Sequence, residues 1–435
     1  MVSTAALRLE GLEPGSRVAL HLPKDERYVA LVLALIRAGH VACPVSDRLP
    51  PRGAVQLLEK AACSALISDD EEFLQKAGAG LQELKPEALL EVARHRTEPT
   101  DIPLERYATI IFTSGSTGVP KAALHTFGNL YHSARGSNAN IPLRPGYRWL
   151  HSLPLYHVGG LSILFRCLLA GATVALPQPG TSLGESIANL GATHVSLVST
   201  QLSRLLREGA DLGRLKAVLM GGGPVQPSLV DEALARGLPL HTSYGLTEMA
   251  SQVTTTPPDA SLEELRTAGR VLPSREVSIS ERGEILVRGE TLFAGYVEGE
   301  ESDRSLDAEG WFHTRDLGEI DESGYLRVGG RMDNLFISGG ENIQPEEIEE
   351  ALCRLDGIDE AVVVPVLDEE FGVRPVAFVR AAGRKPEELA QELEPLLPRF
   401  KIPISFYPWP EEAPRDMKAD RTALGERARR LHRGV

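Results

Sequence analysis

The stretch "IIFTSGSTGVPKAALH", residues 110 to 125, joins a short apolar run to a loop made mostly of Ser, Thr and Gly. Ile110, Ile111 and Phe112 indicate a buried strand, and the loop follows this strand directly. Glycine lets the backbone turn so that successive N–H groups point inward, and the hydroxyls add further donors. The stretch therefore predicts a phosphate-binding loop. Its members are Thr113, Ser114, Gly115, Ser116, Thr117, Gly118 and Lys121.

This loop differs from the Walker A loop, GxxxxGK[ST], which also binds phosphates behind a strand. Pro120 rather than Gly precedes Lys121, and Ala122 rather than Ser or Thr follows it. An ordinary flexible loop is the other interpretation, and its place directly after a buried strand disfavours it. A phosphate site of another class is therefore expected.

Length and charge limit the number of domains and the classes of protein that this sequence can represent. A chain of 435 residues is long enough for at least two domains. Hydrophobic residues at 42% and charged residues at 24% are typical of a soluble globular protein. The formal net charge of -14 argues against a general nucleic-acid or membrane-surface binder. Anionic ligands must then be met by local donors.

Cysteine usage and the termini predict a cytoplasmic protein. Cys43, Cys63, Cys167 and Cys353 lie far apart without any CxxC pair, which indicates buried free thiols and a reducing compartment. The N-terminus lacks the basic start and apolar core of a signal peptide. The longest apolar stretch is too short to span a bilayer and is interrupted by Arg166, so no membrane insertion is expected.

Strands and helices alternate along the first 245 residues. Continuous apolar strands separated by helices predict a parallel sheet covered on both faces. We expect strands at residues 16–22, 108–114, 193–200, 215–223 and 238–245, helices at residues 25–39, 201–209 and 224–237, and a further helix starting near Asn129.

The pattern of apolar and polar residues changes near Arg275. Residues 276–289 and 316–330 each read as two alternating strands joined by a Gly-containing turn, which predicts antiparallel hairpins. Beyond these the pattern returns to α/β, with helices at residues 345–355 and 386–397 and strands at residues 359–366 and 374–381. The predicted fold is α/β. It has an N-terminal domain, residues 1–330, of parallel sheets flanked by helices with a β-rich subdomain at about 270–330, and a small mobile α+β C-terminal domain, residues 331–435.

Three further stretches fit a nucleotide. "VLMGGGP", residues 218–224, ends a strand in three glycines and permits a flat ring to approach the backbone. In "TSYGLTE", Tyr244 is placed to stack on a base, Thr247 to bind a phosphate oxygen and Glu248 to hold Mg²⁺. In "HTRDLGEI", the carboxylate of Asp316 is placed to accept both ribose hydroxyls. The alternative for each carboxylate alone is a solvated charge.

The order of these motifs resembles one family. TSGSTGVPK, YGLTE, TRDLG and GRMDN, followed by a late lysine, resemble the adenylate-forming superfamily of acyl-CoA synthetases, adenylation domains and luciferases over nearly the whole chain. The resemblance implies a large domain that binds ATP and an acid, and a C-terminal domain that swings over it. It implies that the phosphate-binding loop holds the β- and γ-phosphates. It assigns further ATP contacts to Gly222, Gly223, Tyr244, Gly245, Thr247, Asp316 and Arg331, Mg²⁺ to Glu248 and Thr117, the hinge to Asp333, and the entry of coenzyme A to Gly339 and Gly340.

The catalytic lysine is assigned by the same resemblance. "APRDMKADRTAL" offers Pro414, Lys418 and Arg421 at the family's spacing, but Met417 stands where the family has glycine. Lys401 is the only close rival, and a surface lysine in a charged tail is the alternative for Lys418. Its implied role is to stabilise charge on the α-phosphate and carboxylate as the acid attacks. The implied reaction forms an acyl-adenylate and pyrophosphate, after which the thiol of coenzyme A displaces AMP.

The acid pocket is indicated by "LPLYHVGGLSILFRCLLAG", residues 153–171. His157 starts a turn into an apolar helix, and it either lines the pocket with a catalytic role or is a structural histidine. Arg166 is costly in an apolar helix unless it meets an anion or snorkels to water. These stretches, with "RMDNLFISGGENIQPEEIE", resemble the subfamily that activates 2-succinylbenzoate for menaquinone biosynthesis, whose second carboxylate would pair with Arg166. Weaker pocket candidates are Gly221, Gln201, Ser243 and Thr242.

Other functions stay open. The acid could be another aromatic or aliphatic carboxylic acid, the acceptor could be the thiol of a carrier protein, or the chain could bind nucleotide as a regulator without catalysis. The expected partners are small molecules, namely ATP, an acid and coenzyme A, and no nucleic acid. The chain begins near "GSRVALHLP" of the family pattern, so we expect a smaller N-terminal subdomain, and a homodimer is left open.

Overall fold

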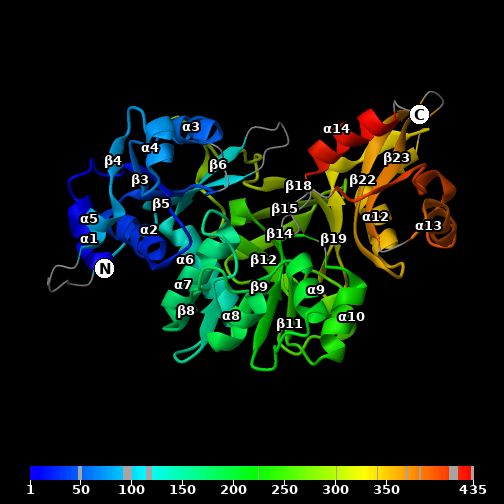
Figure 1. Ribbon diagram of the computed structural model, residues 1–435, viewed down its shortest axis with the longest axis horizontal. Helices are drawn as coiled ribbons and strands as arrows, with labels where there is room; N and C mark the ends of the chain where they lie inside the picture. Colours follow the sequence, from blue (N-terminus) through cyan, green and yellow to red (C-terminus); the bar gives the residue numbers. More distant parts are fainter. Residues whose placement is uncertain are drawn as a thin grey trace.

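The computed structural model places the chain in two large sheets, a smaller antiparallel sheet and a separate C-terminal unit (Figure 1). It describes all residues except 48–50, 92–99, 114–119, 224, 300, 340, 369–370, 382–383, 411–419 and 433–435. The N-terminal elements lie at one end of the molecule and the C-terminal elements at the other. In the described residues, no helix is long and apolar enough to cross a membrane.

The first sheet has eight strands in the order β17-β16-β6-β5-β2-β1-β3-β4. Its strands are β1 Arg17–His21, β2 Val41–Pro44, β3 Ala65–Ser68, β4 Gln82–Leu84, β5 Tyr107–Thr113, β6 Lys121–Thr126, β16 Gly295–Glu298 and β17 Glu301–Asp303. The first five in the chain are parallel, whereas β6 turns back antiparallel to β5 and is followed by β16. Its helices are α1 Val2–Leu9, α2 Glu26–Ala38, α3 Pro51–Lys60, α4 Glu71–Ala77 and α5 Pro86–Leu90.

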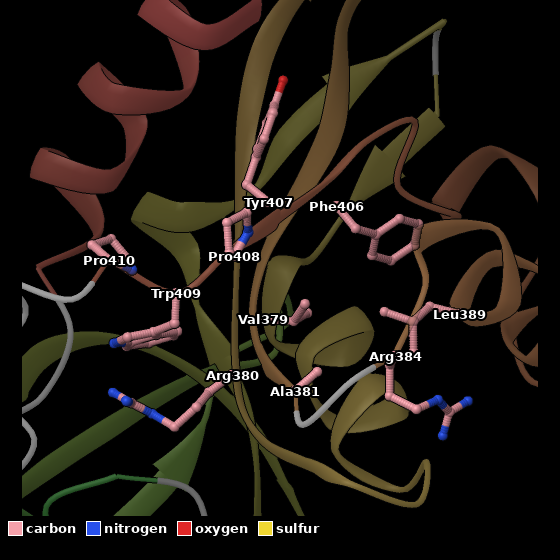
Figure 2. A pocket seen from close by; sticks show the side chains of 10 residues that line it. All are labelled: Val379, Arg380, Ala381, Arg384, Leu389, Phe406, Tyr407, Pro408, Trp409 and Pro410. Carbon is pink, nitrogen blue, oxygen red and sulfur yellow. The ribbon is translucent and has the colours of Figure 1, made fainter.

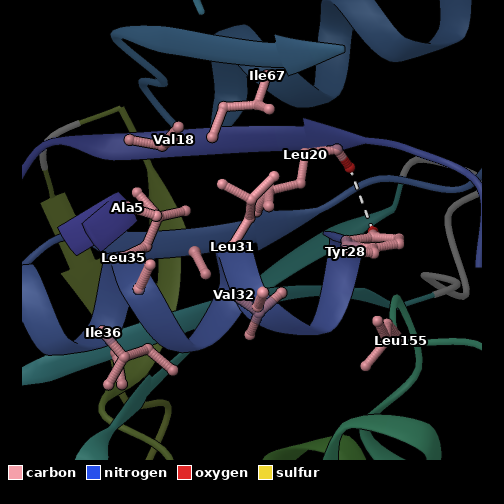
Figure 3. Close-up of a cluster of buried hydrophobic side chains, with 14 of the residues drawn as sticks. Ala5, Val18, Leu20, Tyr28, Leu31, Val32, Leu35, Ile36, Ile67 and Leu155 are labelled. Carbon is pink, nitrogen blue, oxygen red and sulfur yellow. Dashed lines mark hydrogen bonds between the residues drawn. The ribbon is translucent and has the colours of Figure 1, made fainter. Parts of the chain in front are cut away.

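Helix α2 shows why the sequence prediction held in this region. Asp25 caps its N-terminus by accepting hydrogen bonds from the backbone N–H groups of Arg27 and Tyr28, at 3.0 and 3.1 Å. Gly39 ends it with φ at 90°, the left-handed conformation that glycine tolerates best. Between these caps the apolar side chains pack onto β1 and α1, as Figure 3 shows for Leu31 and Leu35.

The second sheet has seven strands in the order β13-β12-β11-β10-β9-β7-β8. They are β7 Arg148–Leu150, β8 Thr173–Ala175, β9 His194–Leu197, β10 Ala217–Met220, β11 Leu240–Leu246, β12 Ser251–Thr255 and β13 Arg270–Val271. Strands β7, β9, β10 and β11 run parallel. The helices of this region are α6 Phe127–Asn140, α7 Val158–Ala170, α8 Leu183–Asn189, α9 Ser199–Arg207, α10 Pro227–Ala235 and α11 Leu262–Leu265.

Helices α6 and α7 form a layer shared by the two large sheets. Leu161 and Leu164 of α7 belong to the apolar core under the first sheet. Ile163 and Cys167 of the same helix belong to the core under the second sheet. A helix buried on both sides has little room for a charge, so Arg166 in this helix is an exception that needs a partner.

The β-rich region splits between two sheets. Strands β14 Arg275–Ile279, β15 Glu284–Gly289, β18 Phe312–Ile320 and β19 Leu326–Arg331 form a four-stranded antiparallel sheet, which contains both predicted hairpins. The intervening β16 and β17 instead extend the first sheet, because β16 pairs with β6. The region between 270 and 330 therefore ties the first sheet to the antiparallel one.

The C-terminal unit contains a three-stranded sheet between helices. Its elements are β20 Phe336–Ser338, β21 Glu341–Ile343, α12 Pro345–Cys353, β22 Ile358–Asp368, β23 Gly372–Ala381, α13 Pro386–Leu393, β24 Phe406–Pro408 and α14 Arg421–His432. The side chain of Asp359 approaches Arg207 at 3.3 Å, and its backbone carbonyl accepts a hydrogen bond from Gln226 at 3.3 Å. These two polar contacts join the unit to α9 and to the start of α10.

The cap of α2 generates a stability prediction. Asp25→Ala removes both hydrogen bonds to the first turn, so we expect it to lower the free energy of unfolding by about 1 kcal/mol. Asp25→Asn keeps an acceptor at the same position and should lose clearly less. Urea unfolding followed by circular dichroism measures both variants, and equal losses would contradict the capping role.

Candidate active site

The second sheet brings several predicted residues to one edge. Because β7, β9, β10 and β11 are parallel, their carboxyl ends meet at the same side of the sheet, where open α/β sheets bind ligands. The segments at this edge carry His157 after β7, Gln201 after β9, Gly221, Gly222 and Gly223 after β10, and Thr247 and Glu248 after β11.

The glycine turn after β10 is open on one side. Gly222 adopts φ of 81°, which favours glycine. A Cβ on Gly221 would lie 3.0 Å from the hydroxyl of Ser243, whereas one on Gly223 would meet nothing within 4 Å. Among the described residues, nothing therefore blocks the approach to Gly223, and the binding of a flat ligand there stays a prediction.

Strand β11 ends in an irregularity that only glycine permits. Its pairing with β12 shifts register between Tyr244 and Gly245, and a Cβ on Gly245 would lie 2.2 Å from the carbonyl oxygen of Ser251. The hydroxyl of Tyr244 then donates a hydrogen bond to Asp316 Oδ2 at 2.7 Å. Burial, with the charge of Asp316, raises the pKa of Tyr244 well above its usual value, so this hydroxyl stays a donor.

Asp316 starts a chain of charges across β18 and β19. Arg331 Nη1 donates to Asp316 Oδ1 at 3.0 Å, and its Nη2 donates to Asp333 Oδ2 at 3.3 Å. Asp333 Oδ1 also lies 2.7 Å from Arg315 Nη2. Burial alone would lower the pKa of Arg331, but the two carboxylates offset this and raise it. Both oxygens of Asp316 thus have partners, and a ribose hydroxyl would use the remaining lone pairs.

A short 3-10 turn, Thr247–Met249, carries Glu248 directly after β11. The Nε2–H of His125 donates to the carbonyl of Thr247 at 2.7 Å, and the N–H of Phe293 donates to the carbonyl of Glu248 at 2.8 Å. Burial lowers the pKa of His125 to about 4, so its ring is neutral near pH 7. The turn is therefore held from β6 and from the segment before β16.

Lys121 and Glu248 both contact the side chain of Tyr296. The ammonium of Lys121 lies 4.4 Å from the ring centre of Tyr296. The hydroxyl of Tyr296 donates a hydrogen bond to Glu248 Oε1. Sequence analysis missed Tyr296, because the stretch "FAGYVEG" carries no motif and its pairing with β6 is not readable from local pattern.

The phosphate-binding loop joins two paired strands. Thr113 and Lys121 are register partners at the ends of β5 and β6. This pairing confirms the predicted strand before the loop and shows a second strand after it, which the sequence analysis did not predict. Ser114, Gly115, Ser116, Thr117 and Gly118 lie outside the described residues, so their contacts with ATP stay predictions.

The donor set fits a magnesium ion that is shared with phosphate oxygens. Mg²⁺ is usually held by one or two carboxylates together with water and substrate phosphates. Glu248 offers such a carboxylate, and among the described residues only Tyr296 donates to it. The described part of the chain contains no group of three or more metal-ligating side chains that could form an all-protein cage.

Arg166 of α7 is buried without a carboxylate. It is 1% exposed, its Nη2 donates to the hydroxyl of Ser251 at 3.1 Å, and its guanidinium lies 5.1 Å from the ring centre of Trp149. Its Nε has no hydrogen-bond partner, and among the described residues no carboxylate lies within ion-pair distance. Burial lowers its pKa to about 10, so it is still charged near pH 7. Snorkelling to water is thereby excluded for this arginine.

Of the other acid-pocket candidates, one is exposed and three form hydrogen bonds with the backbone. His157 is exposed at the N-terminus of α7, where its ring packs edge-on against Tyr156. Gln201 accepts the N–H of Val198 at 3.1 Å, so it caps α9. Ser243 donates to the carbonyl of Met220 at 2.7 Å, and Thr242 donates to that of Thr267 at 2.7 Å. Gln201, Ser243 and Thr242 therefore each have a structural partner, which the sequence did not reveal.

The residues predicted for the second half of the reaction lie in the C-terminal unit. Gly339 turns between β20 and β21 with φ of 57°, and a Cβ there would lie 2.7 Å from the ring of Phe371. This close packing gives Gly339 a structural reason besides the predicted passage of coenzyme A. Lys418 and Gly340 lie outside the described residues. The rival Lys401 is paired with Glu347 at 2.5 Å, and Arg421 with Glu349 at 2.5 Å.

Two cavities in the described part of the chain lie away from this edge of the sheet. One of about 570 Å³ lies at the end of β23 and β24 and is lined by side chains including Arg380 and Trp409 (Figure 2). Another of about 500 Å³ lies beside Glu10 and Arg106 in the N-terminal region. Neither is lined by any predicted site residue, so the candidate site rests on the convergence of side chains at the sheet edge.

Comparisons with known proteins agree with this geometry. The family described as AMP-binding enzyme matches residues 4–297, and the family described as AMP-binding enzyme C-terminal domain matches residues 347–415. The 2-succinylbenzoate–CoA ligase of Bacillus pumilus is 36% identical over 421 residues, which cover 93% of this chain and 86% of that protein.

Solved structures that resemble this chain include two of o-succinylbenzoate CoA synthetase. The o-succinylbenzoate CoA synthetase (MenE) of Bacillus subtilis in complex with the acyl-adenylate intermediate OSB-AMP has a TM-score of 0.87 at 31% identity, covering 97% of this chain and 91% of that one. The same enzyme in complex with ATP and magnesium ion has a TM-score of 0.84 at 32% identity, covering 94% and 89%.

The buried His125 generates a pH prediction. Its pKa is 6.5 when unperturbed and about 4 in the folded protein, so the unfolded state binds the proton more readily between these values. Its contribution to stability is therefore complete above pH 6.5 and is lost as the pH falls to about 4. The gap corresponds to about 3 kcal/mol.

We expect His125→Gln, which keeps a donor for Thr247 but cannot titrate, to flatten the loss of stability between about pH 6.5 and pH 4. Urea unfolding at several pH values measures the slope. His432→Gln, at the last residue of α14, serves as the control. A slope that is the same in wild type and in His125→Gln would contradict the assignment.

Proposed function

This chain belongs to the AMP-binding enzyme family, and from that membership we infer that it is an AMP-forming acid–thiol ligase. It converts 2-succinylbenzoate, ATP and coenzyme A to 2-succinylbenzoyl-CoA, AMP and pyrophosphate in menaquinone biosynthesis. The observation that carries this inference is the match, over more than nine-tenths of the chain, to an enzyme of that name and to a structure with its acyl-adenylate.

The first step makes AMP the leaving group that a free carboxylate lacks. An oxygen of the succinyl carboxylate attacks the α-phosphorus of ATP, the bond to the β-phosphate breaks, and pyrophosphate leaves with the electron pair. The protein mainly positions and neutralises in such a transfer. We assign Lys121 and the phosphate-binding loop to the leaving pyrophosphate, Thr247 to the α-phosphate, and Tyr244, Asp316 and Arg331 to the nucleoside.

Magnesium, when bound at Glu248 and at the predicted Thr117, would neutralise phosphate oxygens and hold them in line with the attacking acid. The remaining residues at the edge of the sheet position the acid. The open backbone at Gly223 leaves room after β10 for the ring system. His157 stands at the start of α7, where a helix N-terminus favours an anion.

The second carboxylate of the acid explains the buried arginine. We assign Arg166 to the aromatic carboxylate, because a charged guanidinium without a carboxylate partner is costly in an apolar layer. An acid with one carboxylate would leave that cost in place. This is the physical basis proposed for selection of 2-succinylbenzoate over simple benzoates and fatty acids.

The second step needs the other unit of the chain. The thiol sulfur of coenzyme A attacks the acyl carbon of the adenylate, the bond to AMP breaks, and the thiol proton is released. We propose that residues 331–435 turn about Asp333 between the steps, so that Lys418 serves the first step and the segment at Gly339 and Gly340 the second. The few polar contacts between Asp359 and the N-terminal part of the chain favour such a movement.

The expected setting of the reaction is the cytoplasm. All four cysteines are buried and free, which agrees with a reducing compartment. The partners proposed are the small molecules of the reaction. The net charge of -14 disfavours a role for nucleic acid.

A panel of acids tests this function. Pyrophosphate and AMP release are measured with 2-succinylbenzoate, benzoate, succinate and a fatty acid, each with and without coenzyme A. The proposal expects release with 2-succinylbenzoate alone of the four acids, and the thioester only when coenzyme A is present. Turnover with another acid but none with 2-succinylbenzoate would overturn the substrate and leave the reaction type.

Arg166 provides a sharper prediction of specificity. With Arg166→Leu, we expect the KM for 2-succinylbenzoate to rise at least about tenfold, because a hydrogen-bonded charge pair contributes about 1.5–3 kcal/mol, while the KM for ATP changes little. With 3-benzoylpropanoate, which lacks only the aromatic carboxylate, wild type and variant should perform alike.

The buried Arg275 offers a matched control for this experiment. It is also buried, and its guanidinium donates to the carbonyls of Pro273 and Ser133, whereas that of Arg166 donates to the hydroxyl of Ser251 at the start of β12. Arg275→Leu should lower stability and affect both acids equally. Equal effects of Arg166→Leu on both acids would show that Arg166 is structural.

Lys418 provides a prediction about the two steps. Lys418→Ala should reduce acyl-adenylate formation at least about a hundredfold, as for the loss of a group that stabilises the transition state. Thioester formation from supplied acyl-adenylate should stay nearly unchanged. Lys401→Ala, which removes an amine already paired with Glu347, is the control. Equal loss of both steps in Lys418→Ala would contradict its role.

A further inference from the structure

Tyr296 lies between two charged residues of the candidate site. The ammonium of Lys121 lies 4.4 Å from the centre of its ring, and its hydroxyl donates to Glu248 Oε1. Neither Lys121 nor Glu248 forms an ion pair with any described residue. Tyr296 therefore contacts both charged groups, the ammonium through the face of its ring and the carboxylate through the hydroxyl at the edge of the ring.

The backbone on each side of this contact is already fixed. The turn that carries Glu248 is held through the carbonyl of Thr247 by His125 and through its own carbonyl by the N–H of Phe293. The side-chain torsions of Glu248 are the freedom that remains. The hydroxyl of Tyr296 removes much of it by holding one carboxylate oxygen, and it leaves Oε2 without a donor among the described residues.

Tyr296 itself is rigidly placed. It is the register partner of Ala123 in the pairing of β16 with β6, the strand that begins at Lys121. Its ring packs edge-on against that of Phe293, with centres 4.8 Å apart and planes at 75°. A side chain held by a strand pair and a ring contact can act as a fixed spacer.

We propose that Tyr296 is a positioning residue for magnesium-bound ATP. It keeps the Lys121 ammonium and the Glu248 carboxylate apart, so that the first stays available to the phosphates and the second to the metal. It also directs a single carboxylate oxygen toward the metal. This proposal rests on the proposed function, in which Lys121 and Glu248 serve ATP and Mg²⁺.

A second tyrosine in the chain has the same arrangement away from this site. The guanidinium of Arg270 lies 4.4 Å from the ring centre of Tyr325, and the hydroxyl of Tyr325 donates to Glu264 Oε1. Glu264 lies in α11 and Tyr325 directly before β19. Removal of this hydroxyl disturbs a cation, a ring and a carboxylate of the same kind, so Tyr325→Phe is a matched control for Tyr296→Phe.

The experiment measures the binding of ATP to the full chain in the absence of any acid. Isothermal titration calorimetry gives the ATP affinity at a series of Mg²⁺ concentrations. For Tyr296→Phe we expect the Mg²⁺ concentration at half effect to rise about five- to tenfold, because one hydrogen bond to a charged group is lost. For Tyr325→Phe we expect the wild-type value. For Tyr296→Leu, ATP affinity itself should also fall, because Lys121 and Glu248 can then pair directly.

Each outcome decides the proposal. An unchanged Mg²⁺ dependence in Tyr296→Phe overturns it, and so does an equal change in Tyr325→Phe, which would indicate general loosening. An unchanged dependence in Glu248→Gln overturns the assignment of Glu248 and the proposal with it. Wild-type protein that binds magnesium-bound ATP as expected, but activates no 2-succinylbenzoate, overturns the proposed acid and leaves the role of Tyr296 supported by the binding data.

Discussion

The site depends on one steric constraint at the end of β11. Any side chain at residue 245 would collide with the carbonyl oxygen of Ser251, 2.2 Å from where its Cβ would lie. With glycine there, the strand shifts register and the chain can turn at once. On one side of this irregularity the hydroxyl of Tyr244 contacts Asp316, and on the other side the carboxylate of Glu248 contacts Tyr296. Under the proposed function, a single irregularity in one strand thus separates the residues assigned to the nucleoside from those assigned to the phosphates and the metal.

Segments far apart in the chain share one apolar core beneath this turn. Ala123, Tyr244 and Met249 pack with Phe293 and Phe312 in the same cluster. Strand β6, the turn that carries Glu248 and strand β18, which carries Asp316, therefore rest on common packing instead of on independent loops. Protein interiors transmit displacements because they are closely packed. Such a base suits a reaction that depends on positioning more than on covalent chemistry.

Local pattern predicted much of the fold but less of the site. Helix α2 with its end at Gly39 and the hairpins β14–β15 and β18–β19 follow from short-range periodicity and glycine placement. Tyr296 and His125 escaped prediction because their partners lie across strand pairings of high sequence separation. Gln201, Ser243 and Thr242 looked like ligand donors, yet each has a backbone partner nearby. Hydrogen bonds to the backbone are decided by geometry, which residue type alone does not reveal.

Arg166 shows how a buried charge without a carboxylate partner can give a protein selectivity for one substrate. Its layer is shared by both large sheets, so the guanidinium cannot reach water without moving a helix that both cores depend on. Under the proposed function, the second carboxylate of the substrate completes this layer as a missing side chain would. Recognition then resembles the last step of folding, in which affinity for the right acid and cohesion of the occupied protein come from the same contact.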